Sequence, residues 1–392
     1  MAVRHGYGKI AGADALVFAY DTGDTRNSYK GEPTENLLND TTEFDSWTKA
    51  RNSGTTPTVT SNTSPNPLGI PNAPMADTLV IPDDGTYPRI QQYFTPTSTN
   101  QHTMSVWIRS LSGDCDCFLG IFRNSPWSLP GHTVVSVTSE WQRFSFTMTP
   151  PDTTTHVAYI GSHDAAAQKG NTLELWGAMI EENSHKTPFT AGTRSATQGL
   201  LDLTGNSTID LSNVSFDSNA QMTFDGTDDW LNIPVALNAG NFTYETVMQA
   251  SNASYQIFSA GTGVPSSGGT TIQAFVNSSG ALINLYAPVG GSGWQYGSYN
   301  NQSAYVGVSG AIRHITVVNL NTNWKTYVNG VLVGDVNFFV PNTGNAIGVA
   351  RAAMQNISTV STTVYMSKVY NRALTAQEVR NNYNQYKGRF NI

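Results

Sequence analysis

Acidic residues are the first candidates for chemistry, because a retaining glycosidase needs two carboxyl groups only about 5–5.5 Å apart. Glu181 and Glu182 are adjacent, so in a strand they would point to opposite faces, and we expect a solvated pair at a strand end. The sequence contains no Gly-x-Ser-x-Gly nucleophile elbow and no His-Glu-x-x-His zinc motif. These patterns predict that the protein is not an enzyme.

A tighter acidic cluster consists of Asp225, Asp228 and Asp229, with Gly226 and Thr227 between them. Carboxylate oxygens are ligands that Ca²⁺ prefers, so this segment is a candidate calcium site. The same five residues also favour a turn, because Asp can bond to its own backbone and Gly adopts positive φ. Both interpretations stay open, and no other cofactor is predicted.

Aromatic residues suggest a binding surface rather than a reaction centre. Exposed aromatic rings can stack on sugar rings or on a neighbouring protein, although most large aromatic side chains belong to a core. Some lie in a segment rich in Gly, Ser and Asn, and others in the first half of the chain. The candidates for glycan or partner binding are Trp294, Tyr296, Tyr299, Tyr305, Trp107 and Trp127.

The overall composition limits the class of protein that positions these residues. Only 12% of the 392 residues are charged, while 39% are hydrophobic and 10% aromatic. The charged fraction is about half that of an ordinary soluble chain, yet the mixture is too apolar for a disordered one. We predict an all-β protein of two antiparallel β-sandwich (jelly-roll) domains plus a short C-terminal helix.

Charge and hydropathy exclude several partners. A net charge of −7 gives no basic surface for nucleic acid. No run approaches the ~20 apolar residues that cross a bilayer, so we expect no membrane partner. The first residues lack the apolar segment of a secretory signal, which indicates synthesis in a cytoplasm. Cys115 and Cys117 are expected to be free thiols, because a bridge between positions so close would be strained.

Hydrophobic alternation locates a first run of strands between residues 78 and 182. Segments such as 103–108 and 143–148 alternate apolar and polar residues, which predicts strands with one buried and one solvated face. Residues 51–76 are rich in Thr, Ser, Pro and Asn, and we expect them to form a long surface loop.

A second run of strands is expected between residues 200 and 370. Within it, Asn329-Gly330 predicts a type I′ hairpin turn, because both residues tolerate positive φ. The end of the chain alone has a helical pattern. Thr375 and Glu378 can form a capping box, which predicts a helix over residues 376–387.

Residues 35–192 resemble a known kind of domain. The segment 173–182, followed by Thr-Pro-Phe at 187–189, resembles the closing strand of carbohydrate-binding-module-like jelly rolls in tailed-bacteriophage structural proteins. Segments similar to the opening phrase and to an internal strand of these modules occur at 36–49 and 140–144, in the expected order. The resemblance implies a jelly roll over residues 35–192.

The last part of the chain resembles a second kind of domain. Segments 224–230, 327–330 and 370–379 are similar to those of concanavalin A-like (laminin G-like) sandwiches. Phage virion proteins of this type often end in a phrase close to the Gly-Arg-Phe found at 388–390. The resemblance implies a concanavalin A-like sandwich over residues 193–392.

These two resemblances suggest the domain boundaries. In such sandwiches a strand like residues 16–21 usually precedes a phrase like residues 202–206, but here the jelly roll separates the two. We expect residues 1–11 to form an N-terminal arm and residues 12–34 to supply the first strand of the C-terminal sandwich, with the jelly roll inserted. Alternatively, residues 12–34 are an arm that docks on another subunit.

The resemblances imply a function through surface contacts. We expect a structural component of a phage virion: an exposed decoration, fibre or spike protein on the head, neck or tail, made in the host cytoplasm and displayed on the particle surface. Its partners would be other virion proteins, further copies of itself and host-surface glycan. The alternatives are a lectin-like adhesin for host polysaccharide and a glycan hydrolase, although the Glu-x-Asp-x-x-Glu motif of glucanase relatives is absent.

Overall fold

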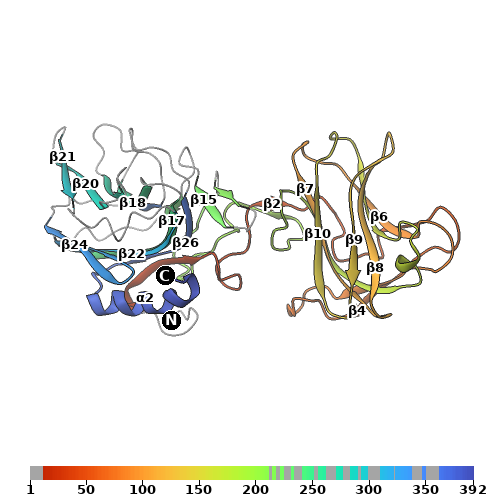
Figure 1. Cartoon of the computed structure of the whole chain (residues 1–392), viewed down its shortest axis with the longest axis horizontal. Helices are drawn as coiled ribbons and strands as arrows, with labels where there is room; N and C mark the ends of the chain where they lie inside the picture. Colours follow the sequence, from red (N-terminus) through yellow and green to blue (C-terminus); the bar gives the residue numbers. More distant parts are fainter. Residues whose placement is uncertain are drawn as a thin grey trace. The chain divides into compact units, whose positions relative to one another are not determined.

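The described chain is nearly all β-strand in antiparallel ladders, which confirms the predicted fold class (Figure 1). It divides into two compact units. The central unit is Pro33–Ser195, and the terminal unit combines the described residues up to Glu32 with Ala196–Ile392. The computed structural model describes residues 12–211, 214–217, 221–224, 231–233, 241–250, 255–261, 271–276, 283–289, 293–298, 310–321, 323–337, 347–349 and 362–392.

The central unit consists of two sheets that pack face to face. One has the strand order β10-β7-β12-β5-β4, with bounds Gln142–Met148, His102–Ser110, Thr172–Glu182, Ala76–Val80 and Thr58–Ser64. The other has the order β3-β6-β11-β8-β9, with bounds Thr48–Ala50, Arg89–Phe94, His156–Gly161, Cys115–Arg123 and Ser128–Val137. A short ladder pairs β2 (Thr34–Glu35) with β13 (Thr193–Arg194), so the two ends of this unit lie together.

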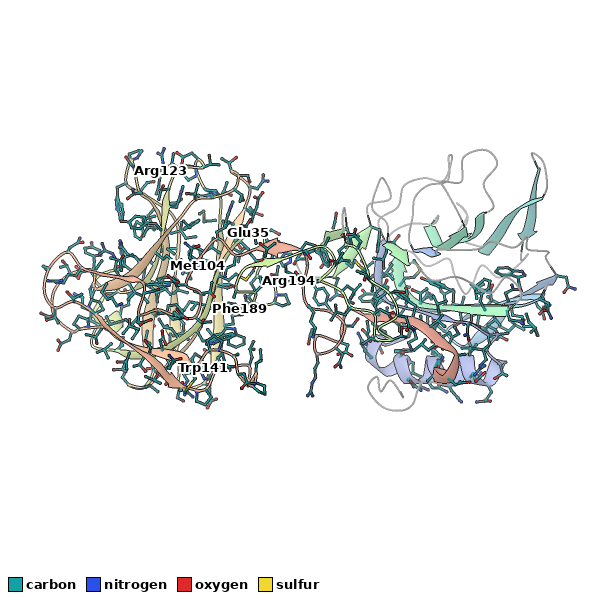
Figure 2. The ribbon with its side chains drawn as sticks, turned by 180° about the vertical axis from the view of Figure 1, so that it is seen from behind. Glu35, Met104, Arg123, Trp141, Phe189 and Arg194 are labelled. Atoms are coloured by element: carbon teal, nitrogen blue, oxygen red, sulfur yellow. The ribbon has the colours of Figure 1, made fainter. Side chains whose placement is uncertain are left out.

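Alternation along the strands places the core between these sheets. Val106 and Ile108 of β7 are fully buried in one cluster with Leu119 and Ile121 of β8, and Met104 belongs to the same cluster (Figure 2). Each such side chain contributes about 1.5–3 kcal/mol when it is fully buried. The shared apolar cluster therefore holds the two sheets against each other.

The outer face of the β7 sheet is not solvated as expected. Thr103 and Ser105 are buried because the segment after β12 crosses over them. The Thr103 hydroxyl donates to the Asn183 carbonyl (2.8 Å), and Arg143 donates to the Ser105 hydroxyl (2.9 Å) and the Thr187 carbonyl (2.5 Å). Alternation correctly predicted the strand, but its polar face carries a second, hydrogen-bonded layer.

Glu181 corrects the expectation of a solvated carboxylate pair. It is fully buried and accepts hydrogen bonds from the Thr187 amide (2.8 Å), the Thr187 hydroxyl (2.7 Å) and the Thr34 hydroxyl (3.0 Å). Glu182 is exposed and accepts a bond from the Asn100 side chain (2.8 Å). The two therefore differ in environment, and solvation was the wrong prediction for Glu181 because the returning segment covers it.

Part of the expected surface loop is a strand. β4 pairs with β5, with Val59 opposite Leu79. The register shifts further along β4, where Asn62 has a φ of 55° and its amide donates to the Asp77 carboxylate (2.9 Å). The polar composition concealed this strand because an edge strand keeps one side open to solvent.

The terminal unit also contains two sheets. One has the order β14-β15-β26-β17-β22-β23-β24, with bounds Ser215–Phe216, Met222–Phe224, Thr362–Tyr370, Asn241–Ala250, Ile312–Leu320, Asn323–Val328 and Val331–Asn337. The other has the order β16-β25-β18-β19-β20-β21, with bounds Leu231–Ile233, Ile347–Val349, Tyr255–Gly261, Thr271–Val276, Ile283–Val289 and Gly293–Ser298. Asn329 (φ 49°) and Gly330 (φ 73°) connect β23 to β24, which confirms the predicted turn.

Strand β1 (Leu16–Asp21) belongs to the terminal unit although the central unit follows it in the chain. It pairs antiparallel with β26, and Phe18 and Tyr20 are fully buried in the core of the terminal unit. The Lys30 amide donates to the Gly199 carbonyl (2.8 Å), so the departing chain lies beside the returning chain. Residues 1–11, the expected arm, lie outside the described residues.

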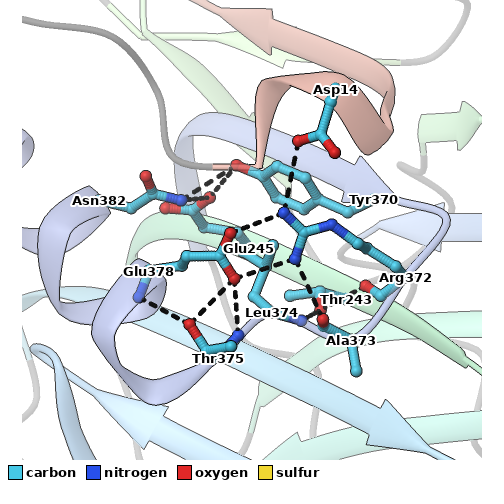
Figure 3. Close-up of polar contacts among 10 residues, drawn as sticks. All are labelled: Asp14, Thr243, Glu245, Tyr370, Arg372, Ala373, Leu374, Thr375, Glu378 and Asn382. Carbon is cyan, nitrogen blue, oxygen red and sulfur yellow. Dashed lines mark hydrogen bonds and ion pairs between the residues drawn. The ribbon is translucent and has the colours of Figure 1, made fainter.

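The described residues contain one α-helix, α2 (Ala376–Phe390), and no helix among them is long and apolar enough to cross a membrane. The predicted capping box is formed: the Glu378 amide donates to the Thr375 hydroxyl (3.3 Å), and the Thr375 amide donates to the Glu378 carboxylate (2.8 Å; Figure 3). The helix extends past the predicted end at residue 387, because Arg389 makes two hydrogen bonds to the Asp21 carboxylate of β1 (2.5 and 2.7 Å).

A fully buried polar cluster joins α2 to the sheet (Figure 3). Glu245 of β17 accepts hydrogen bonds from the Tyr370 hydroxyl (2.6 Å) and the Asn382 amide (3.1 Å), and His314 Nε2 lies 2.7 Å from its other oxygen. Burial would raise the pKa of Glu245, but the Lys368 ammonium and the bonds from His314 and Tyr370 lower it to about 2. The carboxylate is therefore ionised at neutral pH.

We expect this cluster to make the terminal unit sensitive to acid. The pKa of Glu245 is about 2 in the folded chain against a reference value of 4.5, so its stabilisation is complete above pH 4.5 and is lost as the pH falls towards 2. Glu245→Gln leaves the buried Lys368 without its counter-charge, and we expect the free energy of unfolding at pH 7 to fall by about 3–5 kcal/mol.

The measurement is the urea dependence of hydrogen exchange in peptides from α2. Asp335→Asn is the control, because the pair of Asp335 with Lys325 is largely exposed and its loss should cost less than about 1 kcal/mol. A Glu245→Gln variant as stable as this control would contradict the structural role of the cluster.

Cys115 and Cys117 are free thiols that differ in accessibility. Burial raises the pKa of Cys117 to about 12, and the side chain is fully inaccessible, whereas Cys115 is only half-buried. We expect iodoacetamide to alkylate Cys115 in the native protein and both thiols in urea, because the thiolate is the reactive form. Peptide mass spectrometry gives the result, and equal native labelling of both would contradict this prediction.

Candidate ligand-binding face

The structure separates the aromatic candidates of the sequence. Trp127 precedes β9, whereas Trp107 lies on β7 in the other sheet, half-buried near Gly177. Trp294 and Tyr296 belong to β21, of which only the backbone is described. The remaining candidates, for stacking or calcium, lie outside the described residues: Tyr299, Tyr305, Asp225, Asp228 and Asp229.

Trp127 belongs to an aromatic cluster on the outer face of the β8 sheet. Leu119 and Ile121 point into the core, so the alternating neighbours Phe118 and Phe122 point away from it. On β11, Tyr159 lies opposite Gly120 of β8 and joins the same cluster. The rings of Phe118 and Tyr159 meet edge to face with centroids 5.3 Å apart. Both faces of β8 are therefore apolar.

Three exposed ring systems cover these buried phenylalanines. The Trp127 indole stacks on Phe122 with centroids 4.8 Å apart and planes at 20°. His163 stacks on Phe118 at 4.6 Å, and His132 stacks on the same ring at 5.4 Å, both with planes at 18°. The outer rings are held by stacking, although they face solvent. We call this surface the aromatic face; it consists of Tyr93, Phe118, Phe122, Trp127, His132, Tyr159 and His163.

Among the large hydrophobic side chains of this face, Trp127 has 59% of its surface open and Tyr93 has 47%. Arg89 lies at the edge, its guanidinium 5.3 Å from the centroid of the Tyr159 ring. The Arg89 Nε–H donates to the Gln91 side chain (2.7 Å), which fixes the orientation of the group. The Tyr159 ring lies 5.4 Å from Phe122, on which Trp127 stacks, so one face presents both an exposed indole and a cation to a ligand.

The carboxylates around the aromatic face have partners of their own. Asp164 pairs with Lys169 (2.6 Å), Asp152 pairs with Arg123, and the Asp116 carboxylate accepts the Ser136 hydroxyl (3.1 Å). Among the residues that the structure describes, no group of three or more His, Cys, Asp or Glu side chains is placed to hold a metal ion. The arrangement offers a ligand stacking surfaces and a cation.

Sequence reasoning found Trp127 but missed the residues that hold it. The available signal was the segment 117–122, in which Phe118 and Phe122 flank Gly120 opposite the core residues. A strand with aromatic residues on one face and aliphatic residues on the other is apolar on both sides. Such a strand needs a second cover, which here comes from Trp127 and the two histidines.

Comparison with known proteins bears on the terminal unit. Residues 225–380 match a family model described as the concanavalin A-like lectin/glucanases superfamily. Together with its antiparallel sheets, this match gives this part of the chain a concanavalin A-like, laminin G-like fold, as the sequence resemblance implied. A search of proteins with curated functions finds no match.

Among solved structures, this chain is similar to receptor-binding domains of botulinum neurotoxins. The serotype D domain is 13% identical, with 49% of this chain and 51% of that chain covered and a TM-score of 0.37. The type G domain is 18% identical, with 48% of this chain and 49% of that chain covered and a TM-score of 0.37. The serotype D ligand-binding domain in complex with N-acetylneuraminic acid is 14% identical, with 49% of this chain and 49% of that chain covered and a TM-score of 0.38. The alignments span about half of each toxin domain.

The structure predicts different roles for Phe122 and Trp127 in stability. Phe122→Ala removes a buried ring from the outer cluster, and we expect the free energy of unfolding to fall by about 3–5 kcal/mol. Trp127→Ala removes a largely exposed ring, and the loss should stay below about 1 kcal/mol. Urea denaturation of both variants measures the difference. Equal losses would show that Trp127 is a core residue instead.

Proposed function

We propose that this protein is a non-catalytic glycan-binding protein and that the aromatic face of the central unit is a glycan-binding surface. The observation that carries the proposal is the Trp127 indole, exposed over 59% of its surface and yet held parallel to Phe122. A sugar ring presents C–H groups that pack on such a ring, and prior ordering lowers the entropy lost on binding. The lectin-like alternative from the sequence is thus better supported than a purely structural role.

The family match supports the same class of function. The matching model covers lectins as well as glucanases, so the terminal unit is a second candidate for sugar binding. We propose that the aromatic face does not hydrolyse glycan, because its nearby carboxylates Asp164, Asp152 and Asp116 are engaged with Lys169, Arg123 and Ser136. A retaining glycosidase instead needs a nucleophile and an acid about 5–5.5 Å apart.

The test is a glycan array probed with the full chain, Trp127→Ala and Trp127→Phe. We expect the full chain to bind a restricted set of glycans, Trp127→Ala to lose at least about tenfold in affinity, and Trp127→Phe to retain most of it, because stacking is worth about 1–2 kcal/mol. Trp141→Ala is the matched control: Trp141 stacks with Arg109 and lies at the other end of the sandwich from Arg123 (Figure 2). An unchanged Trp127→Ala profile would overturn the proposal.

A second role, in a phage virion, is proposed from the sequence resemblance and from one surface feature. Leu68, Ile70 and Met75 are exposed in the loop between β4 and β5. The loop is ordered by Asn66, whose amide donates to the Ile70 carbonyl (3.0 Å) and whose Oδ1 accepts the Ile70 amide (3.1 Å). Ordered, uncharged apolar side chains favour contact with a neighbouring protein.

This role requires that the protein be part of a particle exposed to the outside. The test is to locate the chain in purified particles from the source of the gene, by mass spectrometry and by antibody labelling of intact particles. Presence in particles and surface labelling would support the decoration, fibre or spike role. A protein found only free in solution would leave the glycan-binding proposal standing and overturn this one.

A further inference from the structure

Three groups that can carry positive charge lie on or beside the aromatic face. The imidazoles of His132 and His163 are exposed and stack on Phe118. Arg89 reaches over Tyr159 from the neighbouring strand β6, and Tyr159 belongs to the same cluster as Phe118. An imidazole can donate hydrogen bonds from its ring nitrogens and can carry a positive charge, so these groups and Arg89 can meet an anionic ligand.

The acidic groups near these histidines are already engaged. On the segment that carries His163, Asp164 pairs with Lys169. On β8, Asp116 accepts the Ser136 hydroxyl, and in the turn before β6 the Asp84 carboxylate accepts the Thr55 amide (3.1 Å).

Tyr87 contacts His163 edge to face, with centroids 5.0 Å apart, and contributes no charge at neutral pH. The remaining charged groups around the face are the Asp152–Arg123 pair and the exposed Asp83. The imidazoles and Arg89 are therefore groups of the face that form no ion pair with these carboxylates, and Asp83 is a further exposed charged group near them.

We infer that the aromatic face selects glycans that carry carboxylate sugars, such as uronic acids, and that Arg89, His132 and His163 provide this selection. The inference rests on the proposed function and names its substrate class. Trp127 would stack on a sugar ring, while Arg89 and the imidazolium groups would pair with the carboxylate. Hydrogen bonds between two charged groups are roughly twice as strong as neutral ones.

The ligand keeps its charge under the conditions of the test. A sugar carboxylate stays ionised at pH 5.5, as carboxyl groups generally do. The chain as a whole carries a charge of −7, which repels a polyanion at long range. At physiological salt this field is screened beyond about 8 Å, so the groups on the face decide the affinity.

The experiment compares matched charged and neutral ligands on the full chain by calorimetry. The probes are oligomers of polygalacturonate, alginate and polysialic acid, each beside its carboxyl-reduced form, at pH 5.5. We expect at least one acidic oligomer to bind about tenfold more tightly than its reduced form at pH 5.5. This preference should shrink in the double variant His132→Gln, His163→Gln.

The controls separate this inference from the proposed function. Lys186→Gln removes an exposed cation of the same unit that lies outside the aromatic face. This variant should keep the preference for acidic oligomers. Equal binding of acidic and reduced forms, with both weakened by Trp127→Ala, would overturn the charge selection and leave glycan binding standing. A preference unchanged in the double histidine variant would overturn the role of the histidines. If no oligomer binds, whether acidic or reduced, this inference is overturned. The glycan array tests the proposed function separately.

Discussion

The pairing of β1 with β26 is the constraint on which the organisation of this chain depends. The Ser367 hydroxyl donates to the Tyr20 hydroxyl (3.3 Å) although the two residues are 347 positions apart. Loop-closure entropy rises by only about 0.6 kcal/mol for each doubling of loop length, so a folded unit can lie between paired strands at little cost. The central unit keeps its own ends together through the β2–β13 ladder. Each unit can therefore complete its own core.

Charged groups also hold the terminal unit together, at the edge strand β1 and in the interior of the sheet. Arg389 bonds to Asp21 of β1, while Glu245, His314 and Lys368 are buried under α2. A buried ion pair adds little stability over an apolar equivalent, but losing one partner is costly. Such a cluster favours a single helix position, because that position lets Glu245 accept hydrogen bonds from both Tyr370 of the sheet and Asn382 of the helix. It connects the N-terminal strand, the sheet and the last residues of the chain.

The proposed binding in the central unit depends on apolar packing outside the main core. A sheet normally buries one face, yet β8 carries Phe118 and Phe122 on the other. Their cover by Trp127 and two histidines produces rings that are ordered and exposed together. Because these rings are already ordered before a ligand binds, less entropy is lost on binding, and a weak stacking interaction can yield useful affinity. The proposed selectivity for acidic sugars uses the histidines that this packing already requires.

The sequence by itself determined the fold class, the Asn329-Gly330 turn and the capping box of α2, because these depend on local periodicity and on one or two residues. It also indicated Trp127, but only as one of several aromatic candidates. Tertiary structure alone decided that Glu181 is buried, that β4 is a strand and that Trp127 and Trp107 lie in different sheets. The physical reason is that these features arise from contacts between segments far apart in the chain. Such contacts produce no periodic pattern in the sequence of either segment.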